Sequence, residues 1–143
     1  MQLYEALKTV ISMRQIRLQG IAIATPGQPK NRYPDLTVLR PDHPDQMRSL
    51  GQAAITLDIA PPLLVVEMVS PGADNHRRDY IDTRNQYEGR GIPEDWIVDP
   101  ERSQVTVLSL RAQGYAEQVF QGDAPLQSPT FPTLTLTAAA ILG

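Results

Sequence analysis

The stretch "PPLLVVEMVSPG", residues 61–72, is a run of apolar residues with one carboxylate, Glu67, set into its middle. Its core, residues 63–69, does not alternate between apolar and polar side chains, which predicts a strand at the centre of a sheet that is covered on both faces. Glutamate is rarely left fully buried unless it is paired or binds a metal. Glu67 therefore needs a partner, a solvated strand end or a chemical role.

The length and composition of the chain limit the other possibilities. A chain of 143 residues is long enough for one core, so we predict a single domain over residues 1–143. Cysteine is absent, which excludes disulfides and thiolate metal sites and fits a reducing cytoplasm. No apolar run reaches the ~20 residues of a membrane span and the N-terminus lacks a signal pattern, so a soluble cytoplasmic protein is expected. The net charge of −3 means that any nucleic-acid contact must come from a local basic patch.

Hydrophobic periodicity predicts three helices and six strands along the chain. Helices are expected over residues 2–12 and 77–90 and, after a strand residue or two, near the end of 134–142. Strands are expected over residues 14–24, with a possible bulge at Gly20, and over 35–40, 63–69, 95–100, 103–111 and 115–120. Residues 41–60 show no clean period and predict a long loop with a weak helical turn or a strand fragment. This order predicts an α/β (α+β) fold with a mixed central sheet flanked by helices.

Two carboxylates lie near the ends of predicted strands. Asp35 opens the strand at 35–40, and Glu67 lies near the end of the strand at 63–69. If these strands are neighbours, the carboxylates meet at one edge of the sheet and raise each other's pKa unless a cation lies between them. Mg²⁺ or Mn²⁺ would fit such oxygen ligands and could promote phosphodiester hydrolysis. The alternative is structural: Asp35 caps a turn or strand, and Glu67 pairs with an arginine such as Arg84.

Four blocks of the sequence, taken in order, resemble the Uma-two family of restriction-endonuclease-like proteins, within the PD-(D/E)XK nuclease superfamily. The blocks are "YPDLTVL", "PPLLVVEMVSPG", "RRDYIDTRNQYEGRGIPEDWIVDP" and "LQSPTFPTLTLTAAAIL", so the similarity runs from about residue 34 to the end. The resemblance implies a restriction-endonuclease-like core with Asp35 as the aspartate of the PD element and Glu67 as the acidic residue of (D/E)XK. It also implies that the two carboxylates and the backbone carbonyl of Met68 bind the metal.

The chain departs from the family pattern at the lysine. The superfamily places a lysine two residues after the acidic residue, where this chain has Val69. Members of the Uma-two group typically carry it on the following helix, in the pattern D-Y-x-x-K-R-x-x-Y. On "DYIDTRNQY", residues 79–87, the aspartate, tyrosines and arginine match, but Thr83 stands at the lysine position. A threonine hydroxyl brings no positive charge, and losing a positioned acid–base or electrostatic group costs about 10²–10⁴ in rate.

Three arginines on or before this helix form a candidate basic patch for a DNA backbone: Arg77, Arg78 and Arg84. Phosphate contacts of this kind position a protein on DNA without reading its sequence. The alternative is an ordinary solvated helix face, because Asp79 and Asp82 are interleaved with the arginines.

The residues and the resemblance together predict a metal-dependent endonuclease that hydrolyses DNA phosphodiester bonds. Asp35, Glu67 and Thr83 occupy its catalytic positions, Mg²⁺ or Mn²⁺ is the expected cofactor, and a homodimer or another partner would supply recognition. One alternative is a catalytically lapsed relative that binds nucleic acid or a protein. Another is a structural dimerisation module that uses the hairpin at 104–120. Whether the chain is an enzyme is left open at this point.

Overall fold

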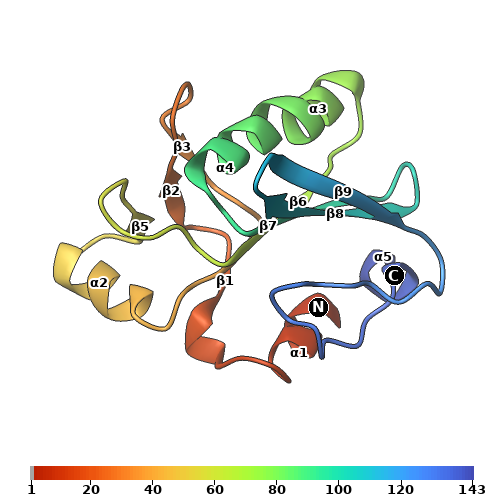
Figure 1. Ribbon diagram of the computed structural model, residues 1–143, viewed down its shortest axis with the longest axis horizontal. Coiled ribbons are helices and arrows are strands. Elements are labelled where there is room, and N and C mark those ends of the chain that lie inside the picture. The colour runs from red at the N-terminus through yellow and green to blue at the C-terminus, as the bar shows by residue number, and fades with distance from the viewer. Residues whose placement is uncertain (1) are drawn as a thin grey trace.

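A six-stranded mixed sheet forms the centre of the protein in the computed structural model, which describes residues 2–143 (Figure 1). The strand order is β1-β4-β6-β7-β8-β9. The parallel pair is β6–β7, and the other neighbours are antiparallel. The bounds are β1 (Ile16–Leu18), β4 (Leu36–Val38), β6 (Leu64–Met68), β7 (Glu94–Asp99), β8 (Gln104–Arg111) and β9 (Gly114–Phe120).

A smaller sheet and several short helices complete the fold. The small sheet has the order β3-β2-β5, formed by β3 (Asn31–Arg32), β2 (Ala22–Ala24) and β5 (Ala54–Ile55). The helices are α1 (Gln2–Leu7), α2 (His43–Leu50), α3 (Ala73–Arg77), α4 (Arg84–Arg90) and α5 (Ala138–Leu142), with a 3₁₀ turn η1 (Met13–Gln15) and a π-helical stretch η2 (Arg78–Thr83). None of the helices within residues 2–143 combines the length and the apolarity needed to cross a membrane.

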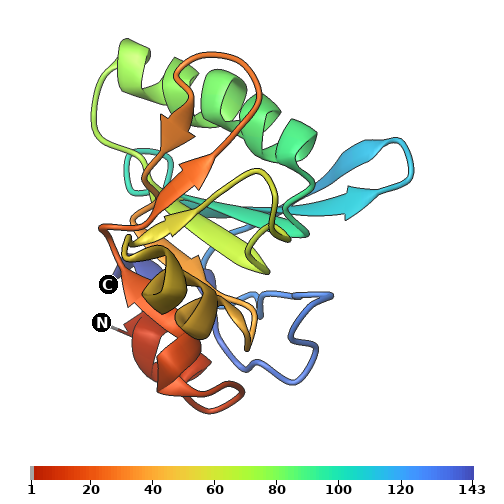
Figure 2. The same cartoon turned by 90° about the vertical axis from the view of Figure 1, so that its left-hand side faces the viewer.

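Helices cover both faces of the central sheet, which explains the continuous apolar run at its centre. The helical stretch α3–η2–α4 crosses one face, while α1 and α5 lie on the other (Figures 1 and 2). Alternate residues of a strand face opposite sides. Accordingly, Leu64 and Val66 join the core that contains α1 and α5, and Val65 joins the core that contains Tyr87 of α4. The predicted fold class is confirmed.

The first helix is shorter than predicted. It ends at Leu7, whereas the periodicity predicted a helix to residue 12. The residues that follow include Thr9, and β-branched residues of this kind are weaker helix formers than leucine or alanine. The hydroxyl of Thr9 donates a hydrogen bond of 2.6 Å to the carbonyl of Ala6, a local bond that competes with the helical ladder.

The predicted strand at 14–24 is wrong as a single element. It divides into β1, which joins the central sheet, and β2, which joins the small sheet. Gln19 and Gly20 both adopt left-handed backbone angles, with φ of 60° and 78°. Two such residues in succession turn the chain away from the sheet instead of forming a bulge within one strand.

Residues 41–60 contain the eight-residue helix α2 and the strand β5, so they are more ordered than predicted. The helix has standard end signals. Pro44 lies in its first turn, and Gly51 closes it with φ of 75°. Its mixed composition hides the apolar face, which is why periodicity alone missed it.

The second predicted helix is confirmed in place but begins earlier. The helical stretch runs from Ala73 to Arg90, where residues 77–90 were predicted. It starts directly after Gly72, a glycine in the loop that follows β6. Gly91, with φ of 81°, ends it as predicted.

Helix α4 holds the small sheet against the central one. The Arg90 guanidinium donates hydrogen bonds to the carbonyls of Ala24, Thr56 and Ile59, at 2.9, 2.8 and 2.8 Å. One turn earlier, the Gln86 amide donates to the carbonyls of Pro26 and Pro29, at 3.0 and 2.8 Å. These bonds fix the β2–β3 hairpin beside the end of β6, where the candidate site lies.

Candidate functional site

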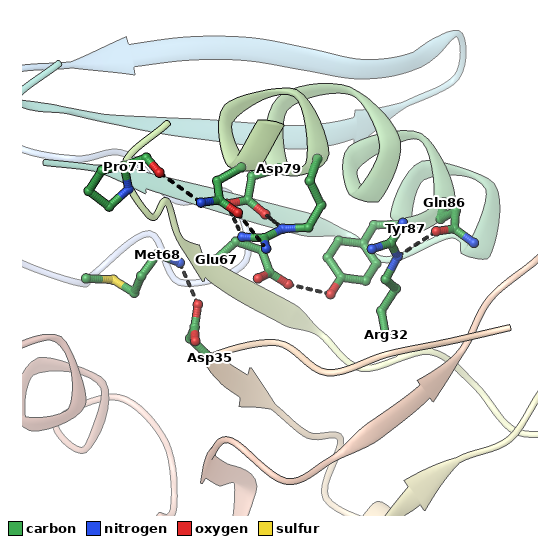
Figure 3. A network of polar contacts seen from close by, with 10 residues as sticks. Arg32, Asp35, Glu67, Met68, Pro71, Asp79, Gln86 and Tyr87 are labelled. Atoms are coloured by element: carbon green, nitrogen blue, oxygen red, sulfur yellow. Dashed lines mark hydrogen bonds and ion pairs between the residues drawn. The ribbon is translucent and has the colours of Figure 1, made fainter. Parts of the chain in front are cut away.

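Asp35 and Glu67 lie at the same end of two neighbouring strands, as expected if the strands were paired. In the antiparallel pair β4–β6, Leu36 lies opposite Val66, so the preceding Asp35 and the following Glu67 end up at the same edge. The backbone N–H of Met68 donates a hydrogen bond of 2.7 Å to Oδ2 of Asp35 (Figure 3). This bond holds the Asp35 carboxylate against the strand that carries Glu67.

Glu67 is buried, with 8% of its surface exposed, and its partner is a tyrosine. The Tyr87 hydroxyl donates a hydrogen bond of 2.6 Å to Oε1 of Glu67 (Figure 3). Burial raises the pKa of Glu67 to about 8; the Tyr87 hydrogen bond opposes this rise, and the nearby carboxylates of Asp35 and Asp79 add to it. Without a cation, this carboxyl holds its proton at neutral pH.

The alternative that paired Glu67 with Arg84 is wrong. Arg84 lies over the ring of Tyr115, 5.9 Å from its centroid, and donates a hydrogen bond of 3.3 Å to the Asn85 side chain. It therefore projects away from the end of β6. Tyr87 is instead the residue that contacts Glu67.

The backbone of Met68 faces the same edge as the two carboxylates. The N–H and C=O of one strand residue point to the same side, and the N–H of Met68 reaches Asp35. Its neighbour Val69 instead donates to the carbonyl of Val98 on β7. The Met68 carbonyl therefore faces the Asp35 side of β6, where it would be the third oxygen ligand of the metal ion expected from the sequence.

A pocket of about 280 Å³ opens beside Glu67. Its walls come from β6, from the β2–β3 region and from the helical stretch: Pro29, Asn31, Arg32, Tyr33, Glu67, Arg78 and Thr83. Thr83 is thus placed at the site, as its position in the family pattern implied. Arg32 and the exposed Tyr33 were not predicted as site residues, because they lie between the predicted strands at 14–24 and 35–40 and belong to no predicted element. Their position immediately before the Pro34–Asp35 pair was the one available signal.

The helical stretch changes its geometry at the pocket. In an α-helix, residues five apart point about 140° away from each other, because each residue turns by about 100°. The stretch η2 is π-helical, and its hydrogen bonds join residues i and i+5. Residues five apart in it are therefore separated by about one turn and lie on nearly the same side of the helix. Arg78 and Thr83, its first and last residues, consequently line the same pocket.

The three arginines of the predicted basic patch have three different surroundings. Arg78 lines the pocket that contains Glu67. Arg77 is exposed and lines a separate hollow with His76. Arg84 packs over Tyr115. The sequence cluster therefore contributes one arginine, Arg78, to the candidate site.

Asp95 is a second buried carboxyl on the face of the sheet that carries Glu67. It is fully buried on β7, opposite Val65 and Leu108, and neither of its oxygens has a hydrogen-bond partner within residues 2–143. Burial raises the pKa of Asp95 well above its usual range. The Asp95 carboxyl is therefore a buried polar group without a partner in the described part of the chain.

Replacing Asp95 by leucine should raise the free energy of unfolding by about 1–3 kcal/mol, because an unsatisfied buried polar group is exchanged for an apolar one among apolar neighbours. Urea unfolding at pH 7 measures the change. Asp95→Asn is the matched control: it keeps the size and the unsatisfied polarity and should give no such gain. A loss of stability in Asp95→Leu would contradict the assignment of this carboxyl as unpaired.

Comparison with known proteins agrees with this architecture. A family model, Uma2, described as "Putative restriction endonuclease", matches residues 3–139. No curated protein matches the chain. Among solved structures, the chain is similar to a "putative nuclease belonging to DUF820" from Anabaena variabilis, with 16% identity and a TM-score of 0.65, over 99% of this chain and 76% of that one. Because the family match covers nearly the whole sequence and the fold agrees, the chain belongs to the Uma2 family.

Proposed function

We propose that this protein is a metal-dependent endonuclease that hydrolyses phosphodiester bonds in DNA. The observation that carries the proposal is the meeting of Asp35 and the buried Glu67 at one edge of the sheet, beside a pocket lined by arginines. The description of the Uma2 family supports DNA as the substrate. The homodimer and the cytoplasmic location expected from the sequence remain predictions.

The residues present fit a Mg²⁺ or Mn²⁺ ion. Within residues 2–143, no three His, Cys, Asp or Glu side chains converge on one point. The donor set is instead the two carboxylates of Asp35 and Glu67 with the carbonyl of Met68. Mg²⁺ is commonly held by one or two carboxylates, with phosphate oxygens and waters completing its octahedron, so a set of this kind suits it. A cation here would also favour the charged form of Glu67, which burial disfavours.

The protein's own residues would orient the groups that take part in the reaction. A bound cation would supply Lewis acidity and neutralise charge on the phosphate. Tyr87 holds Glu67 in one orientation, and the Met68 N–H does the same for Asp35. In the reaction, a water oxygen bonds to phosphorus while the bond from phosphorus to the leaving sugar oxygen breaks. The water gives one proton to solvent, and the leaving oxygen takes one up.

A plasmid-cleavage assay tests the proposal. Wild type should nick supercoiled DNA with Mn²⁺ or Mg²⁺ and not with EDTA. Asp35→Asn and Glu67→Gln should each lower the rate by at least about 10²-fold, because each removes a charged ligand while keeping the shape of the side chain. Glu117→Gln, at an exposed position on β9, is the matched control and should cut as wild type does. Equal cutting by wild type and both site variants would overturn the proposal.

The alternative is a lapsed nuclease, and Thr83 is the observation that favours it. Thr83 lines the pocket at the position where family members carry lysine, and it has no charge. In that case wild type would not cut with either metal, whereas Thr83→Lys would gain metal-dependent cutting that Glu67→Gln abolishes. This result would favour DNA or protein binding as the function.

A further inference from the structure

The candidate site lacks the lysine of the family pattern, but it contains another positively charged side chain. Arg78 lines the same pocket as Glu67 and Thr83. It comes from the opposite end of the π-helical stretch, whose wide turn places positions 78 and 83 at one pocket. A side chain from position 78 can thus reach the space that a lysine at 83 would occupy.

Arg78 is held in place by its neighbours. Its Nε and Nη2 atoms donate to the two oxygens of Asp79, at 2.9 and 3.1 Å, and Nη1 donates to Oδ1 of Asn75 at 3.2 Å. Asp79 is itself buried, with 1% of its surface exposed. A two-point pair with a buried carboxylate fixes the plane of the guanidinium, which a single surface ion pair does not.

This guanidinium keeps donors for a ligand. A guanidinium has five N–H groups, and the three bonds to Asp79 and Asn75 use three of them. One N–H on each terminal nitrogen is therefore without a partner among residues 2–143. The Arg78 side chain is 43% exposed, so these donors are accessible from solvent.

Arg78 keeps its charge and does not pair with the candidate metal ligands. Its hydrogen bonds to Asp79, which are the largest effect, favour its charged form and raise its pKa. Within the described chain, its ion pair is with Asp79 and not with Glu67. The pocket that Arg78 and Glu67 both line is the space in which an anion can contact the guanidinium.

We propose that Arg78 replaces the missing lysine, and that its two free N–H groups bind the scissile phosphate and stabilise the negative charge that develops on it. Asp79 is then a positioning residue that orients Arg78. This inference rests on the proposed nuclease function. Arg32, the other arginine of the pocket, comes from β3 and not from the helical stretch that carries position 83, and it donates to Gln86 at 2.6 Å, so we assign it no part in replacing the lysine.

The decisive test is a rescue experiment with single-turnover cleavage of a DNA duplex in Mn²⁺. Arg78→Gln removes the charge but keeps an amide donor for Asp79, and it should lower the cleavage rate by about 10²–10³-fold, as expected for loss of one electrostatic donor. Adding Thr83→Lys to Arg78→Gln should restore at least a tenth of the wild-type rate. Adding Thr83→Lys to Arg32→Gln should give no comparable rescue.

A binding measurement supplies a readout that does not depend on turnover. In Ca²⁺, binding of the same labelled duplex, followed by fluorescence anisotropy, should weaken by less than about tenfold in Arg78→Gln, because the contact strengthens in the transition state. Arg48→Ala, which removes an arginine from an exposed pair with Asp45 on α2, is the matched charge control. It should leave cleavage and binding unchanged.

The proposal that Asp79 positions Arg78 gives a separate prediction. Asp79→Asn should lower the cleavage rate by about tenfold or more with little change in duplex affinity, while Arg78→Lys should retain part of the activity. Thermal unfolding of each variant confirms that it is folded.

The outcomes separate this inference from the proposed function. If wild type and Arg78→Gln cut equally well, or if Thr83→Lys fails to rescue Arg78→Gln, the role of Arg78 is overturned while the nuclease assignment stands. If wild type does not cut at all, both are overturned. Strong loss in Arg78→Gln with rescue by Thr83→Lys supports the inference.

Discussion

Replacing Glu67 by glutamine should remove a large pH-dependent loss of stability from the metal-free protein. The pKa of Glu67 rises from 4.5 to about 8 on folding, so the folded state holds the proton more tightly than the unfolded state. The stability that this tighter proton binding by Glu67 provides is fully present below pH 4.5 and is lost as the pH rises toward 8. The loss is about 1.4 kcal/mol for each pH unit in this window and reaches about 4 kcal/mol at pH 8.

Thermal unfolding at pH 5, 6.5 and 8 with EDTA measures this effect. Relative to wild type, Glu67→Gln should gain little at pH 5 and on the order of 10 °C in Tm at pH 8. Glutamine can still accept the hydrogen bond from Tyr87, so the comparison isolates the charge. Glu117→Gln should follow wild type at every pH. A constant difference between wild type and Glu67→Gln across this range would contradict the raised pKa.

The same experiment with Mn²⁺ links stability to the proposed metal site. A ligand that binds only the folded state raises its stability, and a cation beside Glu67 also favours the deprotonated form. Mn²⁺ should therefore reduce the pH-dependent loss in wild type and have little effect on Glu67→Gln. Equal stabilisation of both proteins would argue against Glu67 as a ligand.

Replacing Glu94 by alanine should cost about 3–5 kcal/mol of stability. Glu94 is buried at the start of β7, and it accepts hydrogen bonds from the indole of Trp96 at 2.8 Å, from the Ser128 hydroxyl at 2.8 and 2.9 Å and from the Thr130 N–H at 2.6 Å. Alanine would leave these buried donors without their partner and create a cavity. The segment around residues 128–130 would lose its main polar anchor to the sheet.

Urea unfolding followed by tryptophan fluorescence is the suitable measurement, because Trp96 is the one tryptophan of the chain and contacts Glu94 directly. Glu94→Gln should cost less than alanine, since one oxygen can still accept. Glu101→Ala, at an exposed position, should change stability by less than about 0.5 kcal/mol. A loss of similar size in Glu94→Ala and Glu101→Ala would contradict the anchoring role.

Glu94 and Asp95 show why local pattern cannot assign buried charges. They are adjacent in sequence and both buried on β7, yet the first has three donors and the second has none within the described chain. Adjacent strand residues face opposite sides of the sheet. The donors of Glu94 come partly from residues more than thirty positions away, so no local pattern could distinguish the two.

The sequence predicted the elements whose signals are local and strong. The continuous apolar run at 63–69 predicted the central strand, and the alternation at 104–120 predicted the β8–β9 hairpin. The same run also indicated that Glu67 needs a partner. The weaker signals failed: the left-handed pair at Gln19 and Gly20 split one predicted strand between two sheets, and helix α2 lay hidden in a predicted loop.

By itself, then, the sequence determined the fold class and the central strand, because apolar periodicity is a property of consecutive residues. The two carboxylates were predicted as site residues from the chemistry of a buried charge and from the family resemblance. The tertiary structure decided which groups surround those carboxylates. Tyr87 reaches Glu67 across 20 positions, and Arg32 joins the pocket through a hairpin that Gln86 holds against α4. Arg78 and Thr83 meet there because the helix widens to a π-helical turn, a change that the hydrophobic periodicity of the segment did not indicate.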